Sequence, residues 1–100
     1  MPELRRLLDR LRSAGLPLTD SIDAAMRSVD IESFSDHNPV AFWHDRPLVF
    51  LETPRGGVKT ISAPHMVVTM LHHLEISPGQ QVLVLGAKGG YISALIAHKN

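Results

Sequence analysis

A glycine-rich stretch near the end of the chain has residue types that could hold a nucleotide-like cofactor. Residues 82–91 read V-L-V-L-G-A-K-G-G-Y. The four apolar residues at 82–85, bounded by turn signals, predict a strand buried on both faces, and the pattern at 92–97 predicts a helix after it. Glycines let a ligand approach the backbone, and the first N–H groups of the next helix point toward that ligand.

The glycine loop carries neither of two well-known phosphate-binding signatures. Its spacing is Gly86-x-x-Gly89-Gly90, whereas the dinucleotide fingerprint is G-x-G-x-x-G. Lys88 precedes the last glycines, whereas a P-loop needs its lysine after them. Two interpretations stay open at this point: a cofactor loop, or a tight strand-to-helix turn that binds nothing.

The histidines and serines give little support for metal or nucleophilic chemistry. His65 and His72 could share a helix face, but there is no H-E-x-x-H pattern and the only carboxylate of that helix is Glu75. We therefore expect no metal site, and we expect His72 and His73 to interact with the negative end of the helix dipole. Ser62 lacks the G-x-S-x-G setting of a hydrolase nucleophile.

Composition restricts the class of protein. The 100 residues are 44% hydrophobic and 20% charged, which is typical of one modest globular domain. Ten basic and ten acidic residues give a net charge of zero, so nothing favours nucleic acid as a partner. Cysteine is absent, which excludes disulfides and thiolate metal sites. Because no apolar run approaches the roughly 18 residues of a membrane span, we expect no membrane partner and a cytoplasmic location.

Helical periodicity marks the first half of the chain. Leucines with helical spacing predict a helix that ends at Gly15 and Pro17, and Thr19 or Asp20 is the expected cap of the next helix. A short strand is expected at 48–51. The apolar residues expected to face the core are Leu4, Leu7, Leu8 and Leu11 in the first helix and Ile22, Ala25, Met26 and Val29 in the second.

A third helix is expected after a polar cap. Ser62 is a suitable N-cap and Pro64 is tolerated in a first turn. The turn residues at 77–79 end this helix and lead into the strand at 82–85. Its expected buried stripe consists of Met66, Val67, Met70, Leu71 and Leu74.

Two elements about twenty residues apart resemble one known family when they are taken together. They are T-I-S-A-P-H-M at 60–66 and V-L-V-L-G followed by G-Y within 82–91. The pair resembles the protein-L-isoaspartate O-methyltransferase family. Residues 22–29 resemble its "x-A-M-x-x-V" helix, and residues 44–48 resemble its "Y-x-D-x-P-L" segment. The resemblance covers nearly the whole chain.

The resemblance implies a protein-repair methyltransferase. Members of the family transfer a methyl group from S-adenosylmethionine to the side-chain carboxyl of isoaspartyl residues in damaged proteins or peptides. The implied fold is α/β, with N-terminal helices followed by the opening strand-loop-helix of a Rossmann-like methyltransferase sheet, here truncated. Residues 1–58 would form the helical, substrate-side part, and residues 59–100 would begin the cofactor fold.

The resemblance also assigns site residues. Since a carboxylate is already ionised at neutral pH, methyl transfer needs alignment of the reacting groups more than it needs a base. Ser62 matches the serine placed near the methyl donor and the substrate carboxylate, which makes it the expected catalytic residue. The expected substrate-binding residues are Thr60, Ile61 and Pro64, and the expected cofactor-binding residues are Gly86, Lys88, Gly90 and Tyr91.

Three departures from the family pattern leave an alternative function open. Val84 stands where the family usually has an acidic residue. Lys88 stands where it has a loop glycine, so the lysine would either pair with the cofactor carboxylate or block the pocket. The chain ends at Asn100, before the acidic residue that binds the ribose. The alternatives are a non-catalytic peptide-binding module derived from the family and a partly folded fragment without function. We expect no catalysis from the isolated 100 residues.

The expected strand at 82–85 also bears on assembly. A strand with two open edges leaves N–H and C=O groups unpaired, and each one buried without a partner costs roughly 1–3 kcal/mol. The strand expected at 48–51 covers at most one of these edges. The chain is therefore expected to pair with another copy, to belong to a larger parent chain, or to fray at this strand.

Overall fold

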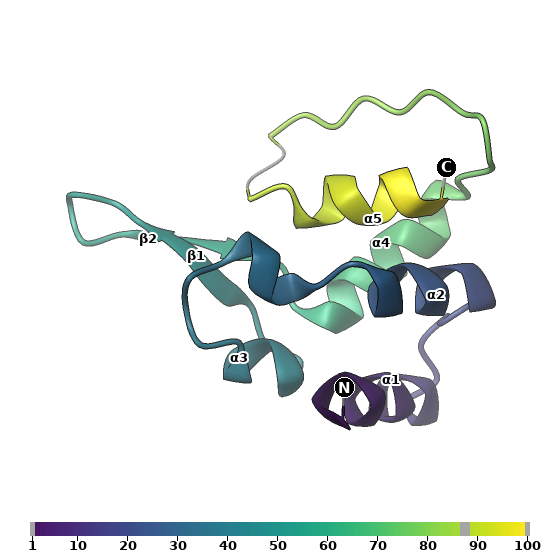
Figure 1. Cartoon of the computed structure of the whole chain (residues 1–100), viewed down its shortest axis with the longest axis horizontal. Helices are drawn as coiled ribbons and strands as arrows, with labels where there is room; N and C mark the ends of the chain where they lie inside the picture. Colours follow the sequence, from purple (N-terminus) through teal and green to yellow (C-terminus); the bar gives the residue numbers. More distant parts are fainter. Residues whose placement is uncertain (1, 87–88, 100) are drawn as a thin grey trace.

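A bundle of short helices with one small hairpin at its side makes up the fold (Figure 1). The computed structural model describes residues 2–86 and 89–99. The mixed α/β class expected from the sequence is confirmed. In chain order, the described elements are helices α1 (Pro2–Ser13) and α2 (Asp20–Ser28), the 3₁₀ turn η1 (Ile31–Phe34), helix α3 (Val40–Trp43), strands β1 (Leu48–Glu52) and β2 (Val58–Ile61), and helices α4 (Pro64–Leu74) and α5 (Tyr91–Lys99).

The two N-terminal helices begin and end as their sequences predict. After α1, Gly15 has φ +82°, and the N–H of Leu16 donates to the carbonyl of Leu11 at 3.2 Å. This is the Schellman motif, whose left-handed position favours glycine because glycine has no Cβ to clash with the backbone. Thr19 is the cap of α2, and its Oγ1 accepts a hydrogen bond from the Ile22 N–H at 3.4 Å. Of the two caps that the sequence left open, the structure therefore selects Thr19.

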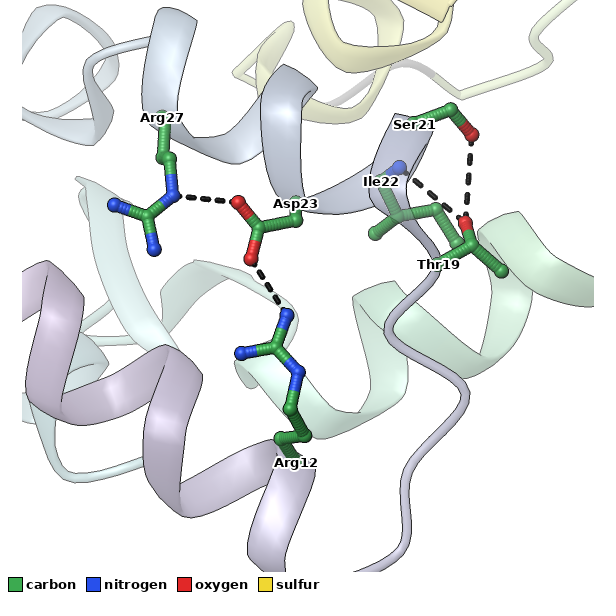
Figure 2. Close-up of polar contacts among 6 residues, drawn as sticks. All are labelled: Arg12, Thr19, Ser21, Ile22, Asp23 and Arg27. Atoms are coloured by element: carbon green, nitrogen blue, oxygen red, sulfur yellow. Dashed lines mark hydrogen bonds and ion pairs between the residues drawn. The ribbon is translucent and has the colours of Figure 1, made fainter.

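An ion-pair network joins α1 to α2 (Figure 2). Arg12 of α1 donates to Asp23 Oδ2 at 2.8 Å, and Arg27 donates from Nε to Oδ1 of the same carboxylate. Partial burial would raise the pKa of Asp23, but the hydrogen bonds and charges of Arg12 and Arg27 outweigh it and hold the pKa below its ordinary value of 3.8. The network is therefore formed with a charged Asp23.

Replacing Asp23 with asparagine is expected to lower the free energy of unfolding by about 1 kcal/mol at pH 7, because both arginines are half exposed and solvent screens them. A lowered carboxyl pKa stabilises the fold above the unfolded value and loses that effect as the pH falls through the folded value. The difference between parent and Asp23→Asn should therefore shrink below pH 3.8. Urea titrations at pH 7 and pH 3 measure it, and an equal difference at both pH values contradicts the assignment.

Strands β1 and β2 form an antiparallel hairpin that stands out from the helices (Figure 1). Leu48 pairs with Ile61 at the base of the hairpin, where both side chains are buried. The register shifts between Val49 and Leu51, which leaves Phe50 as the extra residue of a bulge. The sequence predicted β1 but missed β2, whose run of residues is short and mixes charged with apolar side chains.

Helix α4 begins one residue later than predicted. Its N-cap is Ala63, not Ser62, and Pro64 opens the first turn. The predicted buried stripe is also wrong at its edges, since Met66 and Leu74 are exposed. The residues of this helix that are buried are Pro64, Val67, Val68 and Leu71. The buried face of α4 is therefore rotated toward Val68 relative to the predicted stripe.

The strand predicted at 82–85 is not formed within the described residues. This segment runs extended beside α5, and Val82 and Val84 share a surface pocket with Ser93, Ile96 and Ala97 of that helix. No described strand pairs with it, since the one sheet contains only β1 and β2. As a result, the side chain of Leu83 is 83% exposed and that of Leu85 is 84% exposed. A buried-strand pattern forms a strand only when another strand lies beside it.

One hydrophobic core unites the two ends of the chain. Helix α5 packs along α2, and α4 contacts α2 as well (Figure 1). Within residues 2–86 and 89–99, no helix is long and apolar enough to cross a membrane. The core includes Leu7, Leu8, Leu11, Ile22, Met26, Phe42, Val67, Leu71, Tyr91 and Leu95.

Candidate functional site

An apolar cavity of about 250 Å³ brings the serine loop next to the glycine loop. Ser62, in the connection between β2 and α4, lines one part of it, and Gly86 and Gly89 of the glycine loop line another. These two segments are more than twenty residues apart in sequence, and the family resemblance assigned them to one site. The remaining lining residues are Ile61, Met70, Leu74, Val84, Leu85, Tyr91 and Ile92.

Ser62 is half-buried at a point where the chain changes from strand to helix. Ile61 before it is 3% exposed and pairs with Leu48, and Ala63 after it is 5% exposed. Both neighbours are anchored in the protein, so the serine hydroxyl is carried on a short, fixed segment. Ser62 and Tyr91 are the hydroxyl-bearing residues among those that line the cavity in the described part of the chain.

The three glycines of the glycine loop have different surroundings. Gly86 has φ +66° and a Cβ there would meet nothing within 4 Å, so open space adjoins this backbone. Gly89 is packed instead: a Cβ would lie 3.3 Å from the ring of Phe50 and 3.4 Å from the carbonyl oxygen of Phe34. Gly90 has φ +92°, which favours glycine. Only Gly86 among them has both a lining position and free space for a ligand.

Tyr91, predicted to bind the cofactor, is a buried core residue that also borders the cavity. Its side chain is 2% exposed and packs edge-to-face against Phe34 and Phe42, with ring centroids 5.7 Å and 5.6 Å away. Burial, followed by the charge of Asp30, raises the pKa of the Tyr91 phenol well above its ordinary value. The phenol is therefore neutral, and it acts as a rigid wall of the site.

The other predicted site residues lie around the cavity rather than in its lining. Thr60 is on β2, opposite Val49, and Pro64 is buried in the first turn of α4. Gly90 precedes α5, and its φ fixes the direction in which that helix leaves the loop. Lys88 lies outside the described residues, so its two alternative roles stay predictions.

Sequence reasoning did not assign to the site two aromatic residues that pack on the glycine loop and two apolar residues that line the cavity. Phe34 and Phe50 pack on the glycine loop, and Met70 and Ile92 line the cavity from α4 and α5. No group of three histidine, aspartate or glutamate side chains within the described part of the chain could hold a metal ion. The cavity can thus orient and desolvate a ligand through the Ser62 hydroxyl, apolar walls and an open loop backbone.

Comparison with known proteins agrees with the resemblance. A family model described as Protein-L-isoaspartate(D-aspartate) O-methyltransferase matches residues 3–99. Protein-L-isoaspartate O-methyltransferase from Methanopyrus kandleri is 38% identical over 92 residues, which are 92% of this chain and 39% of the relative. That from Methanothermobacter thermautotrophicus is 36% identical over 98 residues, which are 97% of this chain and 43% of the relative. The chain thus spans about two-fifths of the length of the curated relatives it matches.

Proposed function

Because the chain belongs to the protein-L-isoaspartate(D-aspartate) O-methyltransferase family, we propose that it forms the substrate-side part and the opening cofactor loop of an enzyme that methylates isoaspartyl carboxylates. The observation that supports this proposal is the shared cavity, whose lining includes Ser62 from one segment and Gly86 from another. In this division of roles, residues 1–58 support the substrate side and residues 59–100 begin a Rossmann-like cofactor fold. The proposed location is the cytoplasm.

The residues of the cavity fit the reactive end of S-adenosylmethionine. This cofactor supplies an electrophilic methyl group bound to a positively charged sulfur. Gly86 leaves its backbone open to a ligand, and Met70 and Ile92 offer apolar contact to a thioether and methyl group. The fit covers only part of such a ligand, since the described lining has no carboxylate that could bind ribose hydroxyls.

Ser62 would orient the attacking carboxylate. Its hydroxyl can donate one hydrogen bond to a carboxylate oxygen, which fixes the other oxygen in line with the methyl group. The apolar residues around it exclude water from the carboxylate. Methyl transfer neutralises both the carboxylate anion and the positively charged sulfur. A site of low polarity raises the free energy of these two charges more than that of the neutral products, which favours the reaction. The chain therefore contributes orientation and desolvation.

A methyl-transfer assay tests the proposed function. Residues 3–99 would replace the matched part of the Methanopyrus kandleri relative, and the chimaera would be compared with that relative and with the 100-residue chain. We expect labelled methyl transfer from S-adenosylmethionine to an isoaspartyl peptide by the chimaera, none to its aspartyl isomer, and no turnover by the 100 residues alone. A folded chimaera that binds the cofactor and methylates neither peptide contradicts the proposal.

The alternative is a non-catalytic module that binds isoaspartyl peptides. Val84 favours it, because this residue lines the cavity without the acidic group that is usual in the family. Calorimetric titration of the chain with an isoaspartyl peptide and its aspartyl isomer separates the alternatives. Binding of the isoaspartyl form together with an inactive chimaera supports the module, and equal binding of both isomers rejects it.

The exposed segment at 82–85 predicts a strand partner. Within the described residues its backbone pairs with no strand, and Leu83 and Leu85 are almost fully exposed. We expect the chain to self-associate through this segment unless a longer chain covers it. Sedimentation equilibrium should show a dimer or larger species that Leu83→Lys reduces to a monomer. The matched control is Val58→Lys on the hairpin, where an apolar side chain is 57% exposed. A monodisperse parent monomer would refute this expectation.

A further inference from the structure

Asp45 is an aspartate at a left-handed backbone position that glycine usually occupies. It is one of two non-glycine residues with positive φ in the described part of the chain, at φ +59°. It follows α3, where the Asp45 N–H donates to the Phe42 carbonyl and the Arg46 N–H donates to the Ala41 carbonyl. Glycine is the usual residue at this left-handed position of a helix end. A strained aspartate there points to a role for its carboxylate.

That carboxylate is used twenty residues away, at the start of α4. Asp45 Oδ1 accepts the backbone N–H of His65 at 2.7 Å and lies 2.9 Å from His65 Nδ1. The N-cap of α4 is Ala63, which has no side-chain oxygen for a free N–H of the first turn. Asp45 therefore acts as the missing cap from another element, and its negative charge suits the positive end of the helix.

This contact fixes one end of the short segment that carries Ser62. On the strand side, Ile61 is paired with Leu48 of β1. On the helix side, His65 is held by Asp45, which precedes Leu48 by three residues. The segment 62–64 is thus tied at both ends to the same short stretch, 45–48. Movement of either tie would move the Ser62 hydroxyl relative to the cavity.

We propose that Asp45 is a positioning residue, which places Ser62 by capping helix α4 through the His65 amide. The inference deepens the proposed function, on which its catalytic consequence rests, and it assigns no contact between Asp45 and a substrate. A purely local role as the end residue of α3 predicts a different outcome: glycine would then be the better residue at position 45.

Three variants of the 100-residue chain separate these roles. Asp45→Gly relieves the left-handed strain and removes the cap, and Asp45→Asn keeps a side-chain oxygen that can accept the His65 N–H. Glu75→Gly is the matched control, since Glu75 also has a positive φ, +49°, but lies at the other end of α4, away from residues 61–65. Amide hydrogen exchange at residues 61–66 is the first measurement.

We expect Asp45→Gly to speed exchange of the His65 amide by roughly threefold to thirtyfold, the effect of losing one cap. Asp45→Asn should restore most of the protection, and Glu75→Gly should leave residues 61–66 unchanged. Unaltered His65 exchange in Asp45→Gly overturns the inference. If that variant does not fold, the unmodified chain is measured by NMR instead. We expect a scalar coupling across the hydrogen bond between the His65 amide nitrogen and the Asp45 carboxyl carbon, and its absence overturns the inference as well.

The chimaera adds a catalytic measurement. There Asp45→Gly should lower kcat by roughly tenfold to a hundredfold, the effect of a misplaced orienting group, with the KM for S-adenosylmethionine unchanged and kcat partly rescued by Asp45→Asn. An unchanged kcat overturns the positioning of Ser62. An inactive parent chimaera counts against the proposed function only, and the exchange result still decides whether Asp45 caps α4.

Discussion

Replacing Tyr91 with alanine is expected to remove about 3–5 kcal/mol from the free energy of unfolding, the usual cost of deleting a large buried aromatic side chain. Tyr91 is 2% exposed and makes edge-to-face contacts with Phe34 and Phe42. It also lines both the site cavity and a second cavity of about 190 Å³ beside α2 and α3. Because two cavities already adjoin Tyr91, few side chains lie close enough to fill the space that alanine would leave. Urea denaturation followed by circular dichroism measures the loss.

Tyr91→Phe is the matched control, and it adds a test at alkaline pH. It keeps the ring contacts, so we expect a loss of less than about 1.5 kcal/mol at pH 7. The folded pKa of Tyr91 is raised above its ordinary value of 10.0, so its contribution to stability is fully present below pH 10 and falls as the pH rises above it. The parent should therefore lose stability faster than Tyr91→Phe above pH 10. Parallel curves would show that the phenol is not buried as described.

Ser62→Ala is expected to lower kcat of the methyl-transferring chimaera by roughly tenfold to a hundredfold, because it removes the one hydrogen bond proposed to align the carboxylate. The affinity for S-adenosylmethionine should change much less, since Ser62 belongs to the serine loop and not to the glycine loop. Initial rates at saturating peptide and a separate cofactor titration measure the two effects.

The same substitution should hardly affect stability. If Ser62 capped α4, as the sequence suggested, its loss would cost about 1 kcal/mol. Since the cap residue is Ala63, we now expect a change within about 0.5 kcal/mol. Ser33→Ala, at an exposed position of the turn η1, controls for the loss of a serine hydroxyl elsewhere. A large loss of stability with an unchanged kcat would restore the structural role and refute the catalytic one.

The sequence by itself determined the elements that depend on local chemistry. Leucine spacing gave the core face of α1, Gly15 its end, and Thr19 the start of α2. These features need only neighbours within one helical turn, so periodicity and capping preferences predict them. The paired motifs at 60–66 and 82–91 likewise indicated the family, which the matching family model confirms over residues 3–99.

Tertiary structure decided what depends on distant partners. The apolar run at 82–85 has strand composition, yet in the described part of the chain it pairs with no other strand, and strand hydrogen bonds need a second strand. The glycines of the loop look alike in sequence, but Phe50 packs beside Gly89 while the space beside Gly86 is open. The cap of α4 comes from Asp45, twenty residues before it, and no local pattern identifies such a donor. Local sequence fixes which side chains can cap, turn or pack, and only the fold determines which distant group lies close enough for them to do so.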